Sequence, residues 1–411
     1  MRILHVTPSF QHPLVRGPNR HYHFLRELSK RHSVTLLAMT RTAVPPEAMR
    51  EVESYAEAVF SFGGDMSGLG RYGRHRAVRR AVIEMRRTFR ELVRRQPYDV
   101  VLFHGKSVFP VIAGWSELPI VVDFCDATSM RVRMKLEHAA KTKALFLALR
   151  YEQVQRLERR LAAQTPYRAF ISSRDRAAVL GPDDRSDIVP NGVDLAYWTR
   201  SDVRPGPPCL VFTGVMDYAP NEDGALFLLE EIVPRVRRSV PGLDVLIVGR
   251  DPTSALLERA ADIGRVTVTG FVEDMRPYLE RATVCVAPLR VASGMQNKVL
   301  EAMAMSVPVV ATRVVGAGLR FDEGVEPPIV EADGAAELSA RIVELLGDAA
   351  LRERLANDGR RFIEESFDWA VSAGRLERMC IQAVEGRARG PASEEEEMTT
   401  QRGITRSGAV R

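Results

Sequence analysis

The residues from 289 to 312, LRVASGMQNKVLEAMAMSVPVVAT, hold a small flexible turn, one lysine and one glutamate just before an apolar, β-branched run. Ser293 and Gly294 form the turn after the strand-like segment TVCVAPL, and the pattern from 296 to 305 predicts a helix. A helix that starts beside the carboxyl end of a parallel strand lies where open α/β sheets bind their ligands. The stretch therefore predicts a ligand site.

The predicted helix supplies groups that suit a nucleoside diphosphate. Its free amides and the positive end of its dipole favour phosphate. Lys298 and Glu301 are three residues apart and share one face, so the lysine can meet phosphate while the carboxylate accepts hydrogen bonds from vicinal hydroxyls. Arg290 can add a second charge-assisted bond. The alternative is a surface ion pair between Lys298 and Glu301, worth less than about 1 kcal/mol.

Short apolar segments alternate with longer amphipathic ones along the whole chain, which predicts βαβ units in parallel sheets buried on both faces. A second series of strands begins after a segment rich in Pro and Gly, so we expect two α/β domains in succession. The predicted organisation is a first domain over 1–198, a linker over 199–208 and a second domain over 209–360. A terminal helix over 361–385 follows, which is interrupted near Phe367 and Asp368 and can cross back to the first domain. The last segment, 386–411, is predicted to be a disordered tail.

Composition limits the function classes. In 411 residues, 45% are apolar and 27% charged, with a net charge of +5, as in a soluble globular enzyme. We expect acidic small molecules or an anionic surface as partners and no nucleic acid. The four cysteines are far apart and no histidine stands at ligand spacing, so we expect no disulfide and no metal site. No run reaches about 18 apolar residues, and we expect a cytoplasmic protein.

The segment APLRVASGMQNKVLEAMAMSVPVVATRVVGAGL resembles the donor-binding signature of retaining glycosyltransferases of family four, in the branch with PLR, LEAMA and PVVAT motifs. IVPNGVDLAYW at 188–198 and VFTGVMDYAPNEDGALFLLEEIVP, from residue 211, match the same family in the proper order. The likeness covers nearly the whole second domain and is weak in the first. It implies the GT-B fold, in which two Rossmann-like, doubly wound domains face each other across a cleft.

The resemblance implies roles for the residues of the opening stretch. Glu301 would bind the ribose, and Lys298 and Arg290 would neutralise the diphosphate, with Gly294 and the following amides beside it. Ser293 stands where the family signature has its first glutamate. This departure also occurs in the PLR branch, and it affects the contacts with the donor sugar.

Further positions follow from the resemblance outside that stretch. Gly17, in the loop after the first strand, would face the donor phosphates, and Gly214 would let the backbone approach the diphosphate. Many relatives carry His-Asp where this chain has Cys125 and Asp126. Asp126 or Asp123 could hold donor or acceptor hydroxyls, and Asp126 is the catalytic candidate, although an aspartate at a strand end is as often a helix cap. His104, after the segment DVVLF, is a second candidate, although a histidine satisfied by nearby backbone explains it equally well.

The resemblance implies sugar transfer from a nucleotide-diphosphate sugar to a carbohydrate or lipid-linked acceptor in cell-surface polysaccharide or glycoconjugate biosynthesis, without a cofactor. An arginine-rich helix predicted over 71–96 could lie on anionic lipid at the inner face of the membrane, although a solvated helix with an apolar inner face is the simpler interpretation. The alternatives are a GT-B epimerase or hydrolase and a non-catalytic subunit of a polysaccharide assembly complex. The loop PSFQHPLVRGPNR lacks the G-x-G-x-x-G of dinucleotide oxidoreductases.

Overall fold

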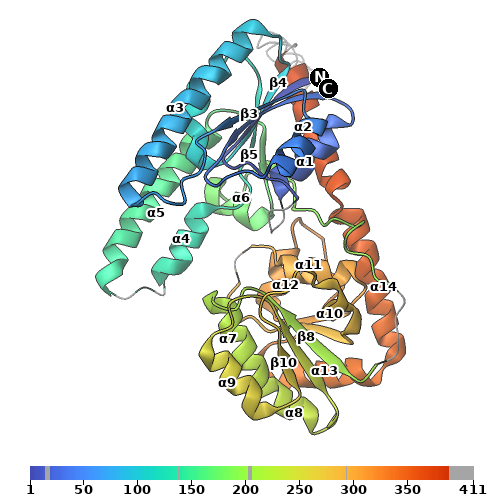
Figure 1. Ribbon diagram of the computed structural model, residues 1–411. Helices are drawn as coiled ribbons and strands as arrows, with labels where there is room; N and C mark the ends of the chain where they lie inside the picture. Colours follow the sequence, from blue (N-terminus) through green and yellow to red (C-terminus); the bar gives the residue numbers. More distant parts are fainter. Residues whose placement is uncertain (14–18, 138, 140, 202–205, 293, 388–411) are drawn as a thin grey trace, which may run out of the picture. The chain divides into compact units, whose positions relative to one another are not determined.

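The computed structural model describes residues 1–13, 19–137, 139, 141–201, 206–292 and 294–387 (Figure 1). These residues form two compact domains. The first comprises Met1–Phe170, Arg176–Val189 and the segment from Ala373, and the second comprises Ile171–Asp175 and Pro190–Ser372. Residues 190–198, which the prediction placed in the first domain, thus lie in the second, and the segment from Ala373 lies in the first.

The described part of the first domain is built on a seven-stranded parallel sheet with the strand order β3-β2-β1-β4-β5-β6-β7. Its elements are β1 (Arg2–Thr7), α1 (Arg20–Ser29), β2 (Ser33–Met39), α2 (Pro46–Tyr55), β3 (Ala58–Phe62), α3 (Arg71–Arg95), β4 (Val100–His104), η1 (Lys106–Val111), β5 (Ile120–Asp123), α4 (Thr128–Glu137), α5 (Lys141–Ala162), β6 (Arg168–Phe170), α6 (Ser173–Leu180) and β7 (Asp187–Ile188).

The described part of the second domain is built on a six-stranded parallel sheet with the strand order β10-β9-β8-β11-β12-β13. Its elements are β8 (Cys209–Thr213), α7 (Ala219–Phe227), η2 (Leu228–Ile232), α8 (Val233–Arg237), β9 (Asp244–Val248), α9 (Ser254–Ile263), β10 (Val266–Val268), α10 (Arg276–Arg281), β11 (Val284–Ala287), α11 (Asn297–Ala304), β12 (Val309–Ala311), α12 (Arg313–Leu319), β13 (Val330–Glu331), α13 (Gly334–Gly347) and α14 (Ala349–Ser366).

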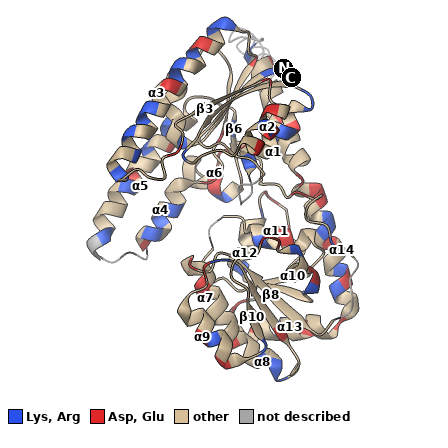
Figure 2. Ribbon diagram, viewed as in Figure 1, with Lys and Arg blue, Asp and Glu red and all other residues tan. Residues whose placement is uncertain are grey.

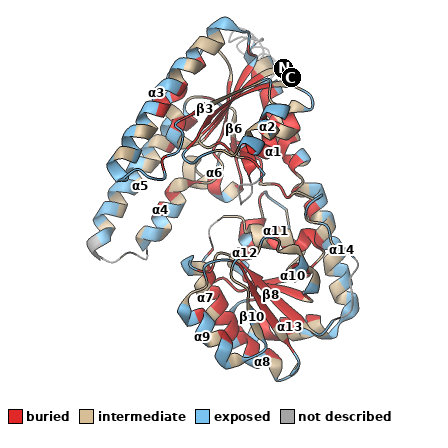
Figure 3. Cartoon of the chain, viewed as in Figure 1, coloured by how far each residue is buried: buried red, intermediate tan, exposed pale blue. Residues whose placement is uncertain are grey.

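Both sheets are buried on both faces, which explains why their strands are apolar without polar alternation. Every residue of β4, β8 and β11 is buried, and Figure 3 shows the strands of each domain as the buried centre of its helices. In each sheet the strand order reverses once, between β1 and β4 and between β8 and β11. The prediction of two Rossmann-like, doubly wound domains is confirmed.

The end of the described chain consists of two helical segments. Helix α14 ends at Ser366, Phe367 is buried, and a second helical segment runs over residues 369–387, so the predicted interruption at Phe367 and Asp368 is confirmed. Residues 388–411, nearly all of the predicted tail, lie outside the described part of the chain. Among the described residues, no helix has the length and apolar character needed to cross a bilayer.

Candidate active site

Four of the predicted donor-binding residues lie where the second sheet reverses its strand order. Gly214 follows β8, and Arg290 follows β11, the neighbouring strand. Lys298 and Glu301 lie on α11, the helix that β11 leads into. The carboxyl ends of strands at such a reversal form the crevice in which doubly wound sheets bind ligands. The topology therefore brings these four positions to one edge of the sheet.

Gly214 allows an unusually close approach of backbone and side chains. A Cβ added to it would lie 2.8 Å from Asn221 Nδ2 and 3.2 Å from Lys298 Nζ. The residue after the neighbouring strand β9 also packs closely on Gly214, because a Cβ on Gly249 would lie 1.7 Å from the carbonyl oxygen of Gly214. Gly214, Asn221 and Lys298 thus meet with no space for a further atom at the glycine. Asn221 was not identified from the sequence, since it lies 77 positions from the lysine it contacts.

Lys298 is a partly buried cation with a neutral partner. Its Nζ donates a hydrogen bond to Asn221 Oδ1 (2.6 Å) and lies 4.5 Å from the centre of the Phe212 ring. Burial lowers the pKa of Lys298 to about 8, because the desolvated ammonium gains only weak compensation from Cys285 and Glu301. The asparagine oxygen balances no charge, so the ammonium is left for an anionic ligand.

Glu301 lies one turn further along α11 and also lacks compensation. Burial raises the pKa of Glu301 to about 7, and the opposing influence of Lys298 is smaller. Both residues belong to the described part of the chain, and no hydrogen bond or ion pair joins their side chains there. The alternative of a surface ion pair is therefore wrong. Two opposite charges that share a face without neutralising each other can take separate parts of one ligand.

Arg290 differs from Lys298 because its charge is already paired. Its Nε lies 2.9 Å from Asp223 Oδ2, a second contact joins its Nη2 to Asp223 Oδ1, and its guanidinium lies 5.2 Å from the centre of the Phe227 ring. Asp223 stands on α7, within the family-matching segment that begins at residue 211, but no role was predicted for it from the sequence. A diphosphate at Arg290 would have to share the guanidinium with Asp223.

The turn before α11 supports the same edge of the sheet. Gly294 has φ +65°, in the left-handed region that favours glycine, and α12 packs closely on it, since a Cβ on Gly318 would lie 2.5 Å from the Gly294 carbonyl oxygen. Two predicted donor-binding residues, Ser293 and Gly17, lie outside the described residues.

His104 belongs to a buried charge network at the strand reversal of the first sheet. Asp123 has no exposed surface. Its Oδ2 accepts a hydrogen bond from Arg20 Nε (2.6 Å), and its Oδ1 accepts one from Arg20 Nη2 (3.1 Å). The same Oδ2 lies 2.9 Å from His104 Nδ1. Burial opposes ionisation of this carboxyl, yet Arg20 and His104 hold the pKa of Asp123 well below its usual range. His104 also has no exposed surface. Its visible role is to contact Asp123.

Asp126 stands at the surface of the same region. Its Oδ2 lies 3.1 Å from Arg131 Nη1, and its backbone carbonyl accepts a hydrogen bond from Lys106 Nζ (2.6 Å). Lys106 also pairs with the buried Glu158 at 3.1 Å. The aspartate thus holds the start of α4 through backbone and side chain, and its catalytic assignment stays a prediction.

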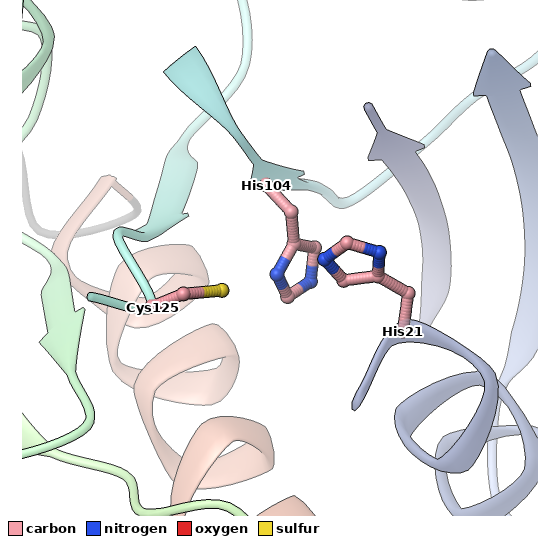
Figure 4. Close-up of side chains that lie close together, drawn as sticks. All are labelled: His21, His104 and Cys125. Carbon is pink, nitrogen blue, oxygen red and sulfur yellow. The ribbon is translucent and has the colours of Figure 1, made fainter. Parts of the chain in front are cut away.

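His21, His104 and Cys125 converge from α1, β4 and the segment after β5 (Figure 4). They can each offer one ligand atom, and these atoms lie within 4.8 Å of one another. A tetrahedral zinc ion with bonds of 2.0–2.3 Å holds its ligands only about 3.5 Å apart. Burial also raises the pKa of the Cys125 thiol, and Asp123 raises it further, which disfavours the thiolate. The three ligand atoms are brought together, but the neutral thiol disfavours metal binding.

Comparison with known proteins assigns the second domain to a family. Residues 207–348 match the family described as glycosyl transferases group 1. The chain carries a group 1 glycosyltransferase domain. The chain is 27% identical over 255 residues to phosphatidyl-myo-inositol mannosyltransferase of Mycolicibacterium smegmatis, a match that covers 59% of this chain and 63% of the relative. It is 30% identical over 228 residues to D-inositol 3-phosphate glycosyltransferase of Nocardia farcinica, a match that covers 50% of this chain and 49% of the relative. The chain thus spans about half to under two thirds of these relatives.

The fold of the chain is also that of solved GT-B structures. The crystal structure of Anabaena HepE in complex with UDP and glucose has a TM-score of 0.61, with 16% identity over 92% of this chain and 98% of HepE. The resemblance inferred from the PLR, LEAMA and PVVAT motifs is confirmed, and so is the GT-B type of fold. Lys298, Glu301 and Arg290 all lie inside the matched glycosyltransferase domain.

Proposed function

We propose that the chain is a retaining glycosyltransferase that moves a sugar from a nucleotide-diphosphate sugar to a carbohydrate or lipid-linked acceptor. The observation that supports this most is the pair on α11 at the strand reversal. Lys298 is a cation that forms no ion pair among the described residues, and Glu301 is a carboxyl group one turn away that compensates it only weakly. Diphosphate and ribose diol are the ligand groups that would satisfy both.

Transfer requires that the bond between the anomeric carbon and the diphosphate oxygen breaks as the acceptor oxygen bonds to the same carbon. The leaving diphosphate gains negative charge, so a fixed ammonium and backbone amides lower the barrier. In the proposed reaction, the acceptor proton passes to the leaving phosphate on the same face of the sugar. Lys298 and the amides near Gly214 would hold that phosphate, and Glu301 would fix the nucleoside so that the sugar is correctly placed.

The acceptor class follows from the named relatives and from the first domain. The relatives are named for phosphatidyl-myo-inositol and D-inositol 3-phosphate, which favours a phosphorylated or lipid-linked acceptor in glycoconjugate or polysaccharide synthesis. Helix α3 is rich in arginine (Figure 2), but Val82 and Phe89 are buried against the domain, so its apolar face is not free. On α5, by contrast, Leu145, Phe146 and Leu149 are 58–72% exposed. These side chains support peripheral contact with an anionic membrane as part of the proposal.

A panel of UDP-, GDP- and ADP-sugars tests the donor site. Binding to the native state raises the melting temperature, so one nucleotide class should stabilise the wild type. Glu301→Ala and Lys298→Ala should lose that shift and most of the transfer rate, and Glu353→Ala, an exposed position on α14, should keep both. Unchanged donor kinetics in a folded Glu301→Ala protein would remove the assignment.

The same panel separates the alternatives. Rapid hydrolysis or epimerisation of the donor without acceptor would indicate a GT-B hydrolase or epimerase. Nucleotide binding without turnover across donors and acceptors would indicate a non-catalytic subunit. Flotation with anionic vesicles at low salt tests the membrane contact, and absence of binding there would exclude it.

A further inference from the structure

An open cavity of about 330 Å³ lies in the first domain where α3 begins. Its lining is Arg41, Arg71, Arg74, His75 and Val78. The volume is at the lower end of the range for ligand pockets, about 300–1,000 Å³. Three arginines, one histidine and one valine thus line a space large enough for a small polar group.

The charge of this cavity is not balanced by carboxylates. No Asp or Glu is in the lining, and within the described residues no ion pair involves Arg41, Arg71 or Arg74. Further along α3, Arg80 pairs with Glu84 at 3.0 Å and Arg87 pairs with Glu91 at 2.9 Å, while the other arginines of this described helix form no ion pair. The positive charge at the start of α3 is therefore uncompensated, and the cavity is what distinguishes it from the rest of the helix.

The start of α3 is also the end where cations are least favoured. The first turn contains no acidic residue, and Gly70 caps the helix without a side-chain hydrogen bond. The dipole of the helix is positive at this end, so it interacts unfavourably with the positive charges of Arg71 and Arg74. An anion bound between the two arginines would interact favourably with both the arginines and the dipole. Arg74 Nη2 donates to the Leu69 carbonyl (3.2 Å), which holds its guanidinium near the helix start.

We propose that this cavity binds a phosphate group, either of an anionic lipid headgroup or of a free phosphorylated molecule. Guanidinium forks match phosphate oxygens and form bidentate, charge-assisted bonds with them. Tyr72 and Leu69 next to the cavity-lining residues are 76% and 39% exposed and can contact the apolar part of such a ligand. The proposal concerns binding by the first domain alone, so it does not depend on the donor site.

The test compares two double variants of α3 that remove the same charge. Arg71→Gln/Arg74→Gln alters the cavity, and Arg80→Gln/Arg87→Gln alters the paired arginines. Each full-length protein is titrated with inorganic phosphate, with sodium chloride matching the ionic strength, and is floated with phosphatidylcholine vesicles that contain or lack phosphatidylglycerol. Both double variants keep the donor site unchanged, so the difference between them reports on the cavity and not on phosphate bound at Lys298.

We expect phosphate or anionic vesicles to bind the wild type, Arg71→Gln/Arg74→Gln to bind roughly tenfold more weakly, and the control pair to bind as the wild type does. Phosphate binding that Arg71→Gln/Arg74→Gln weakens identifies a site for free phosphorylated molecules, and a loss confined to vesicle binding identifies a lipid headgroup site. Without any anion, Arg71→Gln/Arg74→Gln should melt no lower than the wild type, since it removes repulsion. Equal losses in both variants, or no binding of either probe, would overturn the proposal.

Discussion

Replacement of Glu301 by glutamine should stabilise the free protein and weaken its binding of nucleotide. Burial raises the pKa of Glu301 from 4.5 to about 7, so its ionised form is disfavoured in the folded state. This rise corresponds to about 3 kcal/mol, because each pKa unit is worth about 1.4 kcal/mol. The residue is not fully buried, and solvent screening reduces the expected gain to about 1–2 kcal/mol at pH 8.

The dependence on pH follows from the two states of the carboxyl. Below pH 4.5 it is protonated in both the folded and the unfolded chain, so the variant and the wild type should be equally stable. Between pH 4.5 and about 7 only the unfolded chain ionises freely, and the stability of the wild type falls relative to the variant. Above pH 7 the difference should stay constant.

Urea unfolding of the wild type, Glu301→Gln and the exposed control Glu353→Gln at pH 5, 6, 7 and 8 measures this difference. An added nucleoside diphosphate should stabilise the wild type more than Glu301→Gln, because only the carboxylate accepts both ribose hydroxyls. The reasoning fails if Glu301→Gln is less stable than the wild type at pH 8, or if their difference does not change between pH 5 and 8.

Three further predictions concern pH, packing and the first domain. The kcat/KM for donor should fall below pH 7 as Glu301 is protonated and above about pH 8 as Lys298 loses its proton; a flat profile from pH 6 to 9 would contradict these roles. Gly214→Ala should raise the donor KM roughly tenfold, as its methyl group would lie 3.2 Å from Lys298 Nζ, whereas Gly242→Ala, with open space around it, should not. Asp123→Asn should lower the free energy of unfolding by about 3–5 kcal/mol in urea titrations, because it removes the carboxylate that compensates the buried Arg20 guanidinium. A loss under about 1 kcal/mol would refute that.

The sequence contains most of the information about the two sheets. Strands such as β4 and β8 are continuous apolar runs, and this composition arises because both of their faces are covered. The break at Phe367 and Asp368 could also be predicted, since the pattern of the helix changes there. The exact division between the domains could not, because residues 190–198 are assigned by the partners they contact, such as the Phe367 carbonyl that accepts the Val193 amide.

For the site, the sequence identifies groups on one element but not their distant partners. Lys298 and Glu301 were identified because a helical spacing of three puts them on one face. Asn221 and Asp223 lie in a family-matching segment, but their contacts could not be predicted, because they lie 77 and 67 positions from Lys298 and Arg290. Only the fold brings them together. The consequence for charge is large, since Arg290 is paired and Lys298 is not.

The two strand reversals show how charge separates a structural network from a ligand site. In the first domain, Asp123 is surrounded by Arg20 and His104, and its pKa is far below the usual range, so the network already stabilises its own charges. In the second, the pKa values of Lys298 and Glu301 are both shifted toward the neutral forms, so the charged forms cost free energy until something else solvates them. A fold retains such a cost where a ligand removes it. This contrast is why we propose the donor site at α11 and a stabilising role for Asp123, although Asp123 is more deeply buried.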